Sequence, residues 1–333
     1  MAYITATATG LADLLDKFKT FCESNGYTTD SYVTEGAGKR WHAHHANGSF
    51  VNFRAYINET PDYSAFYNYS GGLSGLSFNV GTGYSSAAAW HAQPGVPVGT
   101  NNRYPTAGIA KIIGAVPNYH FFASNNGANI FAVVEFNAGQ YQWFGWGNLN
   151  KIGQWTGGRY FVGSRFGTAM DVAAQYSYLS GVGFFSCNDS SATNSNSFVD
   201  VAVDGETGWH YGENNYNAYN QTTRRVCDNF RHFQAQLDLV PNQSTGRTPH
   251  LPVRVEVYRD TTSSYSQSTR NEIGILPDVV YISTKAFTPG QQITLGSANY
   301  RVFPFFSKGA ARDYYFYGSN IFHSGYYGFA VKE

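Results

Sequence analysis

The sequence has 333 residues, a length that suits one large domain or two domains of ordinary size. Lys plus Arg and Asp plus Glu both number 22, so the formal net charge is zero, which argues against a protein that binds nucleic-acid phosphates through a basic surface. Only 13% of the residues are charged while 17% are aromatic, and this favours β-structure partly covered by protein partners; an extracellular β-domain with an uncharged polar surface is the alternative.

The first predicted element is an amphipathic helix over residues 10–25. Its apolar residues recur at steps of three and four and form a single stripe, made of Leu11, Leu14, Leu15, Phe18, Phe21 and Cys22. Thr9 is the expected N-cap, Asp13 falls in the first turn, and Gly26 is a suitable stop. We expect the stripe to pack on a sheet.

A β-hairpin is predicted next. Two runs, WHAHH at 41–45 and SFVNFRAYI at 49–57, flank an Ala-Asn-Gly turn sequence. Alternation along the second run gives one apolar face and one mixed face. A short strand is expected around 76–80 and a short helix over 85–91, followed by a Pro-rich loop.

The strongest strand signal lies at 118–149, where three aromatic runs are joined by Asn-Gly and Asn-Ala-Gly turns, a pattern typical of a β-meander. Polar segments at 188–197 and 203–224 are expected to be exposed loops unless another subunit covers them. A second β region is predicted near the C-terminus, with strands at 253–258, 278–284, 291–296, 299–306 and 326–331.

These elements predict an α+β fold dominated by antiparallel β-structure, with meander or sandwich-like sheets and the N-terminal helix packed on one of them. Two lobes are expected. Residues 1–180 would hold the helix and the meander, and residues 181–333 would hold an Asn/Tyr-rich insertion and the C-terminal strands; a single domain is the alternative.

The cysteines indicate no redox or zinc site. Cys22, Cys187 and Cys227 are far apart and form no CxxC pair, so we expect buried thiols in a reducing cytosol. The N-terminal residues lack a signal-peptide pattern, and no run approaches the ~18 apolar residues of a membrane span. The expectation is a soluble chain made in the cytosol, without membrane insertion.

His42 and His44 alternate on one predicted strand face, a spacing that can place two imidazoles beside a metal ion. A third ligand is missing from the pattern, and His45 would point the other way. Histidines on a half-exposed strand more commonly form ordinary polar surface, so no metal site is assigned.

The charged and glycine-rich motifs match no specific catalytic or ligand-binding pattern. Asp200, Asp204 and Glu206 do not fit an EF-hand; a glycosidase pair formed with a distant segment stays open, beside solvated loop acids. Arg224 and Arg225 form an isolated basic pair. Gly157-Gly158 follows no βα pattern and favours a tight turn or close backbone contact over a phosphate cradle. The signatures of common NTPases, dinucleotide-binding enzymes, hydrolases and zinc proteases are absent, so no catalytic or cofactor-binding residue is assigned.

Aromatic residues are the best candidates for binding. Tyr-rich segments at 63–69, 211–219, 314–317 and 326–327 could stack on sugar rings or anchor protein interfaces, and the interface interpretation is preferred. The residues expected to carry interfaces are Trp143, Phe144, Trp146, Trp155, Tyr160 and Trp209. Some of them are expected to be core, because Trp is highly buried on average.

Three blocks of the sequence resemble virion structural proteins of tailed bacteriophages. The opening, MAYITATATGLADLLDKFKTFCESNGY, is similar to their N-termini, in which a small-residue Thr/Ala stretch leads into a Leu-Leu-rich helix. The second block, 119–164, resembles the aromatic meander of one such group, and the third, made of 276–308 and 326–331, resembles its closing segments. The segment 188–250 resembles nothing in that group.

This resemblance implies a structural component of the virion, most consistent with the tail or baseplate, that acts by protein–protein assembly and has no catalytic role. The implied partners are other virion proteins and further copies of the chain, as a trimer or hexamer, because tails and baseplates have those symmetries. A receptor- or carbohydrate-binding protein of the tail tip or fibre is the first alternative, and a depolymerase of surface sugars is the second.

Overall fold

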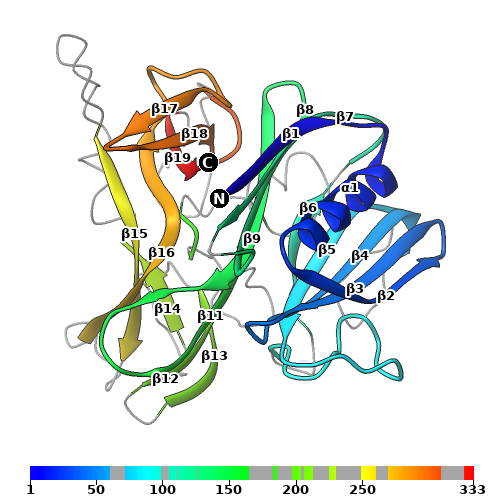
Figure 1. Cartoon of the computed structure of the whole chain (residues 1–333), viewed down its shortest axis with the longest axis horizontal. Coiled ribbons are helices and arrows are strands. Elements are labelled where there is room, and N and C mark those ends of the chain that lie inside the picture. Colours follow the sequence, from blue (N-terminus) through cyan, green and yellow to red (C-terminus); the bar gives the residue numbers. More distant parts are fainter. Residues whose placement is uncertain are drawn as a thin grey trace, which may run out of the picture.

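The computed structural model describes residues 1–60, 72–98, 104, 106–110, 112–124, 126–164, 183–185, 197–203, 206–212, 225–229, 249–259, 269–308 and 326–333. These residues are mostly β-strand and include one α-helix (Figure 1). The fold is therefore β-rich, in broad agreement with the α+β prediction.

The helix is α1 (Leu11–Ser24). The strands of the first half are β1 (Ala2–Ala8), β2 (Tyr27–Glu35), β3 (Gly38–His45), β4 (Phe50–Glu59), β5 (Leu73–Gly81), β6 (Ala107–Ala110), β7 (Val116–Ser124), β8 (Asn129–Asn137), β9 (Gln140–Asn148), β10 (Asn150–Lys151) and β11 (Thr156–Gly163). Those of the second half are β12 (Phe198–Val203), β13 (Glu206–Gly212), β14 (Arg225–Asp228), β15 (His250–Arg259), β16 (Thr269–Ser283), β17 (Gln292–Leu295), β18 (Ala298–Pro304) and β19 (Tyr327–Lys332).

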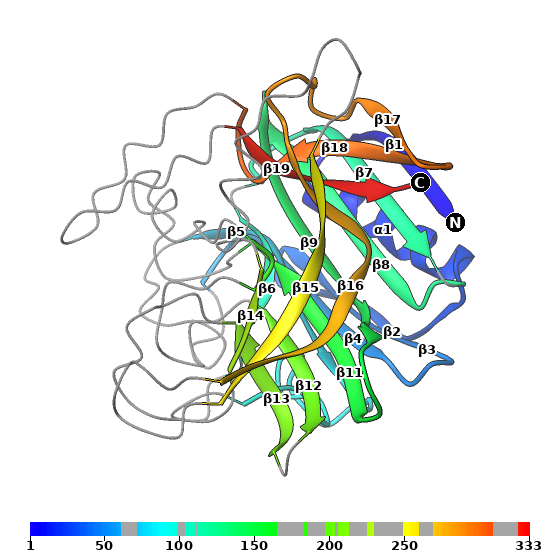
Figure 2. The same ribbon diagram turned by 90° about the vertical axis from the view of Figure 1, so that its left-hand side faces the viewer.

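The strands form two sheets. The small sheet has five strands in the order β2-β3-β4-β5-β6. The large sheet has fourteen, in the order β1-β7-β8-β9-β11-β12-β13-β14-β15-β16-β19-β18-β17, with β10 attached to β16. It curves until its two limbs face each other, and the N- and C-terminal strands lie near one another (Figures 1 and 2). A backbone hydrogen bond of 2.8 Å from Tyr141 to Phe306 joins the limbs.

The predicted amphipathic helix is confirmed, but its cap differs. All six residues of the apolar stripe are buried. The N-cap is Gly10 rather than Thr9, and it provides no side-chain cap. Instead the carboxylate of Asp13 accepts hydrogen bonds from the Thr9 backbone N–H (2.8 Å) and hydroxyl (3.2 Å). Gly26 follows the helix with a positive φ of 93°, as a stop residue should.

The first core lies between α1, the small sheet and one face of the large sheet. Phe18 of α1 is at its centre, with its ring 4.7–6.2 Å from five other aromatic rings, those of Phe121, Phe144, Phe53, Trp146 and Trp41. The Trp146 indole N–H donates a 2.7 Å hydrogen bond to the Tyr27 hydroxyl, so the buried polar atom is paired. The predicted packing of the helix stripe on a sheet is therefore confirmed.

The second core fills the space between the limbs of the large sheet. Phe131 and Trp143 from one limb meet Phe329 from the other, with ring centroids 5.6 and 5.7 Å apart. Strands β8 and β9 thus have a core on each face, since their alternate residues belong to the first core. This explains why the predicted meander is apolar and aromatic at nearly every position.

The predicted hairpin at 41–57 is confirmed by the antiparallel pairing of β3 and β4. Its turn glycine, Gly48, has φ 84°, and a Cβ added there would meet nothing within 4 Å. The turn between β7 and β8 contains Gly127, which also has φ 84°, but here a Cβ would lie 1.7 Å from the backbone oxygen of Asn25.

We expect Gly127→Ala to destabilise the protein by at least about 1 kcal/mol more than Gly48→Ala. The two glycines share the same φ, so the backbone strain of alanine is matched and the excess reports the clash with the chain leaving α1. Urea unfolding followed by tryptophan fluorescence measures both values. Equal losses in the two variants would contradict this close approach.

The helix predicted over 85–91 is wrong, because this stretch forms turns. Its backbone is held by Gln93, whose buried side-chain amide accepts a hydrogen bond from the N–H of Ser85 (2.7 Å) and donates to carbonyls of Ser85, Ala88 and Ala89 (3.1 Å each). Side-chain hydrogen bonds of this kind, from one residue to carbonyls four to eight positions earlier, have no periodic sequence signal.

Two segments of the second half differ from or extend the predictions. Part of the polar segment 203–224 is strand β13, which pairs antiparallel with β12. The dipeptide Asp204-Gly205 is a recognised hairpin signal and could have indicated it. The proposed lobe boundary near 180 lies outside the described residues; β11 and β12 on either side of it are paired directly.

Candidate functional site

Four of the six residues predicted to carry interfaces are buried inside the chain. Trp143 and Tyr160 belong to the second core, and Phe144 and Trp146 to the first, with exposures of 0–5%. Their strands lie in the middle of the large sheet and are covered on both faces. The interface prediction is therefore corrected for these four, because folding already uses their contact surface.

Trp155 and Trp209 are half-buried and remain surface candidates. Both indole N–H groups donate to backbone carbonyls of the same chain at 2.8–3.1 Å. A cation of the chain also lies near each ring, Lys151 at 5.3 Å from Trp155 and Arg159 at 6.0 Å from Trp209. These intramolecular contacts hold both rings in place and leave part of each accessible.

His42 and His44 of β3 form hydrogen bonds with other side chains of the protein. The ring of His42 is buried and its Nδ1 lies 2.8 Å from Asn52 Oδ1, and burial lowers the pKa of this imidazole. His44 Nδ1 lies 2.8 Å from the carboxylate of Asp30. Within the described ranges no group of three or more His, Cys, Asp or Glu residues could hold a metal ion.

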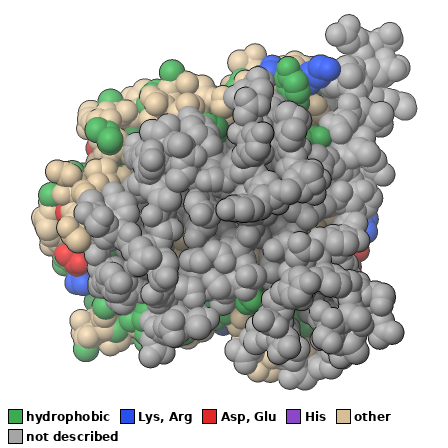
Figure 3. All heavy atoms as spheres, turned by 180° about the vertical axis from the view of Figure 1, so that it is seen from behind, with side chains coloured by type: hydrophobic (Ala, Val, Ile, Leu, Met, Phe, Trp, Pro, Cys, Tyr) green, Lys and Arg blue, Asp and Glu red, His purple; other side chains and the backbone are tan. Residues whose placement is uncertain are grey.

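The acidic and basic motifs give only one described pair. Asp200 accepts a 2.7 Å hydrogen bond from Arg159 in an ion pair between β12 and β11. Asp204 and Arg224 lie outside the described residues, and so do the side chains of Glu206 and Arg225. On the face shown in Figure 3, the coloured surface carries scattered charges and no large patch of one sign.

Gly157 and Gly158 mark a close backbone contact, as predicted. Both have positive φ, 90° and 100°, and the pairing of β11 with β12 shifts register beside them. A Cβ on Gly157 would lie 2.4 Å from the carbonyl oxygen of Asp200. The pair therefore serves the sheet, and it lies at no helix N-terminus in the described structure.

The Tyr-rich segments at 63–69 and 314–317, and most of 211–219, lie outside the described residues. Of the fourth, Tyr326 is exposed, with the ammonium group of Lys285 at 5.7 Å from its ring, while Tyr327 is buried. One exposed tyrosine does not distinguish sugar binding from a protein interface.

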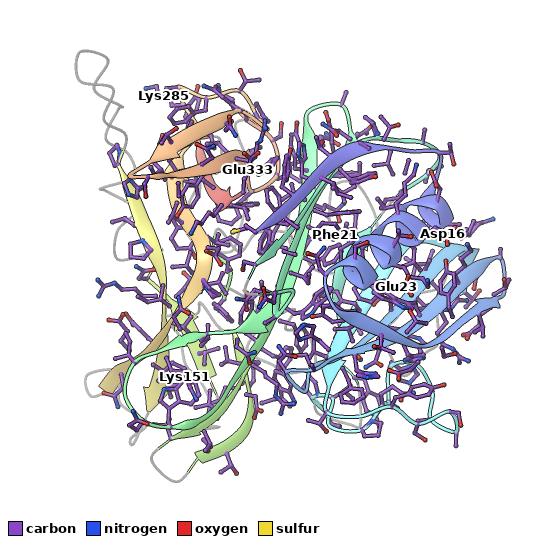
Figure 4. All side chains as sticks on the ribbon, in the orientation of Figure 1. Asp16, Phe21, Glu23, Lys151, Lys285 and Glu333 are labelled. Atoms are coloured by element: carbon purple, nitrogen blue, oxygen red, sulfur yellow. The ribbon has the colours of Figure 1, made fainter. Side chains whose placement is uncertain are left out.

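A groove of about 480 Å³ opens between β1 and α1. Its lining includes Ala2 and Ile4 of β1, Lys17 and Phe21 of α1 with the C-cap residue Asn25, and Tyr119 of β7. Phe21 and Tyr119 are buried and form an apolar floor. Figure 4 shows Phe21 on the side of α1 that is turned towards β1.

The rim of the groove is polar, but its groups are already paired. Lys17 Nζ donates to Asp13 (2.7 Å) and to the Thr7 carbonyl (2.9 Å). The hydroxyls of Thr20 and Ser24 donate to helix carbonyls one turn back, both at 2.9 Å. The arrangement suits apolar contact with a protein segment, and it places no pair of carboxylates or nucleophile–base pair for catalysis.

Strand β1, which forms one wall of the groove, is not among the elements predicted from the sequence. Its residues, AYITATA, belong to the small-residue stretch that carries part of the family resemblance. The β-branched residues Ile4, Thr5 and Thr7 are a usable strand signal. A single strand cannot be confirmed from sequence alone, because its partner β7 lies more than a hundred residues away.

Neither a protein-family model nor a curated protein matches this sequence. In the part of the chain that the structure describes, no helix is both long enough and apolar enough to span a membrane.

Proposed function

We propose that this chain is a structural protein of a tailed-bacteriophage particle, associated with the tail or baseplate. It acts by packing against other virion proteins and against copies of itself, three or six in number. In this proposal the chain is made in the cytoplasm of the bacterial host and resides in the virion. It binds neither nucleic acid nor membrane and performs no catalytic step.

One observation supports the proposal most. The three sequence blocks that resemble phage structural proteins are far apart in the chain but contiguous in space. The first supplies β1 and α1, and the second supplies most of β7 and all of β8, β9, β10 and β11. The third supplies about half of β16, all of β17 and β18, and most of β19. Strand β1 pairs with β7, and the ring of His120 on β7 lies 4.7 Å from that of Phe303 on β18. A resemblance carried by a single packed body is what a shared subunit fold would produce.

The surface chemistry agrees with assembly. A chain with equal numbers of acidic and basic residues has no net self-repulsion when copies are brought together. The groove and the edge of the large sheet at β1 are sites for contacts with other proteins. Glycan or receptor binding at a tail tip is the second candidate, with the half-buried indole rings of Trp155 and Trp209 as its stacking surfaces.

The proposal is tested on phage particles purified from a lysate of infected bacteria in which this chain is produced. We expect quantitative mass spectrometry of particles banded on a density gradient to find the chain at a fixed ratio to the major capsid protein. A non-structural protein of the same lysate serves as the control and should be lost during banding. Absence of the chain from intact particles would overturn the proposal.

The tail-tip alternative gives a different result. It predicts that the purified chain binds host cells or cell-wall glycans, and that Trp155→Ala and Trp209→Ala weaken this binding. A protein that acts only in assembly shows no such binding, in the wild type or in either variant.

A further inference from the structure

Strand β1 is an open edge of the large sheet. It pairs with β7 and with no other described strand, and it lies at the rim of the sheet in Figure 2. Ile4, Thr5, Ala6 and Thr7 are all exposed, so neither face of this stretch is fully covered. Among the described side chains, only that of Lys17 donates to a carbonyl of β1.

The other described sheet edges are protected. Strand β2 carries Asp30 and Glu35 and has a register shift after Thr29, while β17 has only four residues. Strand β6 is also short, and the side-chain amide of Gln142 hydrogen-bonds both the N–H and the carbonyl of Ala110 at 2.7 and 2.9 Å. Charges, irregular pairing and covering groups are the devices by which proteins keep edges from pairing with other chains.

Strand β1 has little of this protection. Residues 2–8 contain no charged residue and no proline, and their pairing with β7 is regular up to Ala6. Ile4 is 39% exposed and stands at the mouth of the apolar groove beside α1. An uncharged edge next to an apolar groove is suited to receive another strand whose side chains extend the same face.

We propose that the occupant is β1 of a second copy of this chain, paired antiparallel about a two-fold axis. If this axis is perpendicular to the sheet, each face of one copy continues into the same face of the other. Even-numbered residues of β1 then lie opposite even-numbered residues, and odd-numbered opposite odd-numbered. The register centred on Ile4 places Ile4 opposite Ile4, Ala2 opposite Ala6 and Tyr3 opposite Thr5. The two isoleucines then cover each other where each is exposed in the single chain.

The absence of charged residues from β1 favours pairing of this strand with its own copy. Self-pairing places like residues together, and like charges placed directly opposite destabilise a strand pair. Strand β2 would bring its acidic residues towards their own copies, whereas β1 brings none. The zero net charge of the whole chain removes long-range repulsion between the copies.

The inference rests on the proposed function in that it names one subunit contact of the assembly. It also narrows the copy number, because a two-fold contact fits six copies arranged as three pairs and does not fit a simple three-membered ring. Its test uses the purified full chain. A failure there overturns the β1 contact alone, whereas absence of the chain from particles overturns the function.

The test is sedimentation velocity over a range of concentrations. We expect the wild-type chain to form dimers or multiples of dimers, and Ile4→Lys and Ile4→Glu to lose this contact, because each places two like charges opposite one another. An equimolar mixture of the two variants should regain it, since Lys then faces Glu. Val33→Lys on the β2 edge is the matched control, as Val33 is also 39% exposed, and it should assemble like the wild type.

Cross-linking gives a second measurement of the register. Residues opposite each other in antiparallel strands have Cα atoms about 4.5–5.5 Å apart, within the range that a disulfide bridges. Ile4→Cys should therefore form a covalent dimer on mild oxidation, and Val33→Cys should not. A monomeric wild type, unchanged assembly in both Ile4 charge variants, or no rescue in their mixture would each overturn the proposal. Far-UV circular dichroism checks that every variant is folded.

Discussion

Phe18→Ala is expected to lower the free energy of unfolding by about 3–5 kcal/mol, the usual cost of removing a buried phenylalanine. The Phe18 ring is fully buried and contacts aromatic residues from the small sheet and from the large sheet. The substitution would leave a cavity in the first core, between the two sheets. Because protein interiors are close-packed, the surrounding side chains could fill little of that cavity. Urea unfolding at neutral pH, followed by tryptophan fluorescence, measures the loss.

Two further variants keep this prediction testable. Phe136→Ala removes the same ring from a partly exposed position and should cost no more than about 2 kcal/mol. If Phe18→Ala does not fold at all, Phe18→Leu retains most of the volume and should unfold at a measurably lower urea concentration than the wild type. Similar costs for Phe18→Ala and Phe136→Ala would contradict a core centred on Phe18.

Acid is expected to destabilise the protein before its carboxylates are protonated, because of His120. This imidazole is 4% exposed, its Nδ1 lies 2.9 Å from the Tyr3 hydroxyl, and its ring faces Phe303. Burial, with a smaller contribution from the charge of Arg301, lowers the pKa of His120 to about 4. The unfolded chain binds this proton near pH 6.5, so stability is complete above that pH and falls as the pH drops towards 4. The loss amounts to about 3 kcal/mol over this window.

The measurement is urea unfolding at a series of pH values between 7 and 4. His120→Gln cannot take up the proton and should show a shallower fall in stability over this range, although it starts from a lower stability at pH 7. Burial lowers the pKa of His42 in the same direction, so part of the acid effect should persist in the variant. Identical slopes for the wild type and His120→Gln would show that His120 is not the buried neutral group described here.

Protonation of His120 is also expected to weaken the contact between β1, β7 and β18 of the large sheet. Tyr3, which hydrogen-bonds it, lies on β1, and the guanidinium of Arg301 on β18 is 5.1 Å from the Tyr3 ring. A proton on His120 would place two positive charges in this contact between the limbs. The same contact holds β1 in position, so the proposed self-pairing of β1 should also weaken at low pH.

The local elements of this protein follow from residue patterns within short segments. The helix stripe from Leu11 to Cys22, the hairpin around residues 46–48 and the meander at 118–149 could be predicted because each depends on periodicity and turn residues within a few positions. The hairpin of β12 and β13 has such a signal in Asp204-Gly205, and the prediction of an exposed loop there is wrong for the residues of β13. Composition also pointed correctly to a β-rich fold.

Which of the aromatic strand residues lie on the surface depends on tertiary contacts. Tryptophan is a residue type typical of interfaces, yet both Trp143 and Trp146 are buried. Trp146 lies in the first core, beneath α1, and Trp143 lies in the second core, between the limbs of the large sheet. Likewise β1 becomes an edge strand only because β7, more than a hundred residues later, pairs with one side of it and no described strand takes the other. Burial and edge position depend on contacts between segments distant in sequence, and residue patterns within one segment do not encode them.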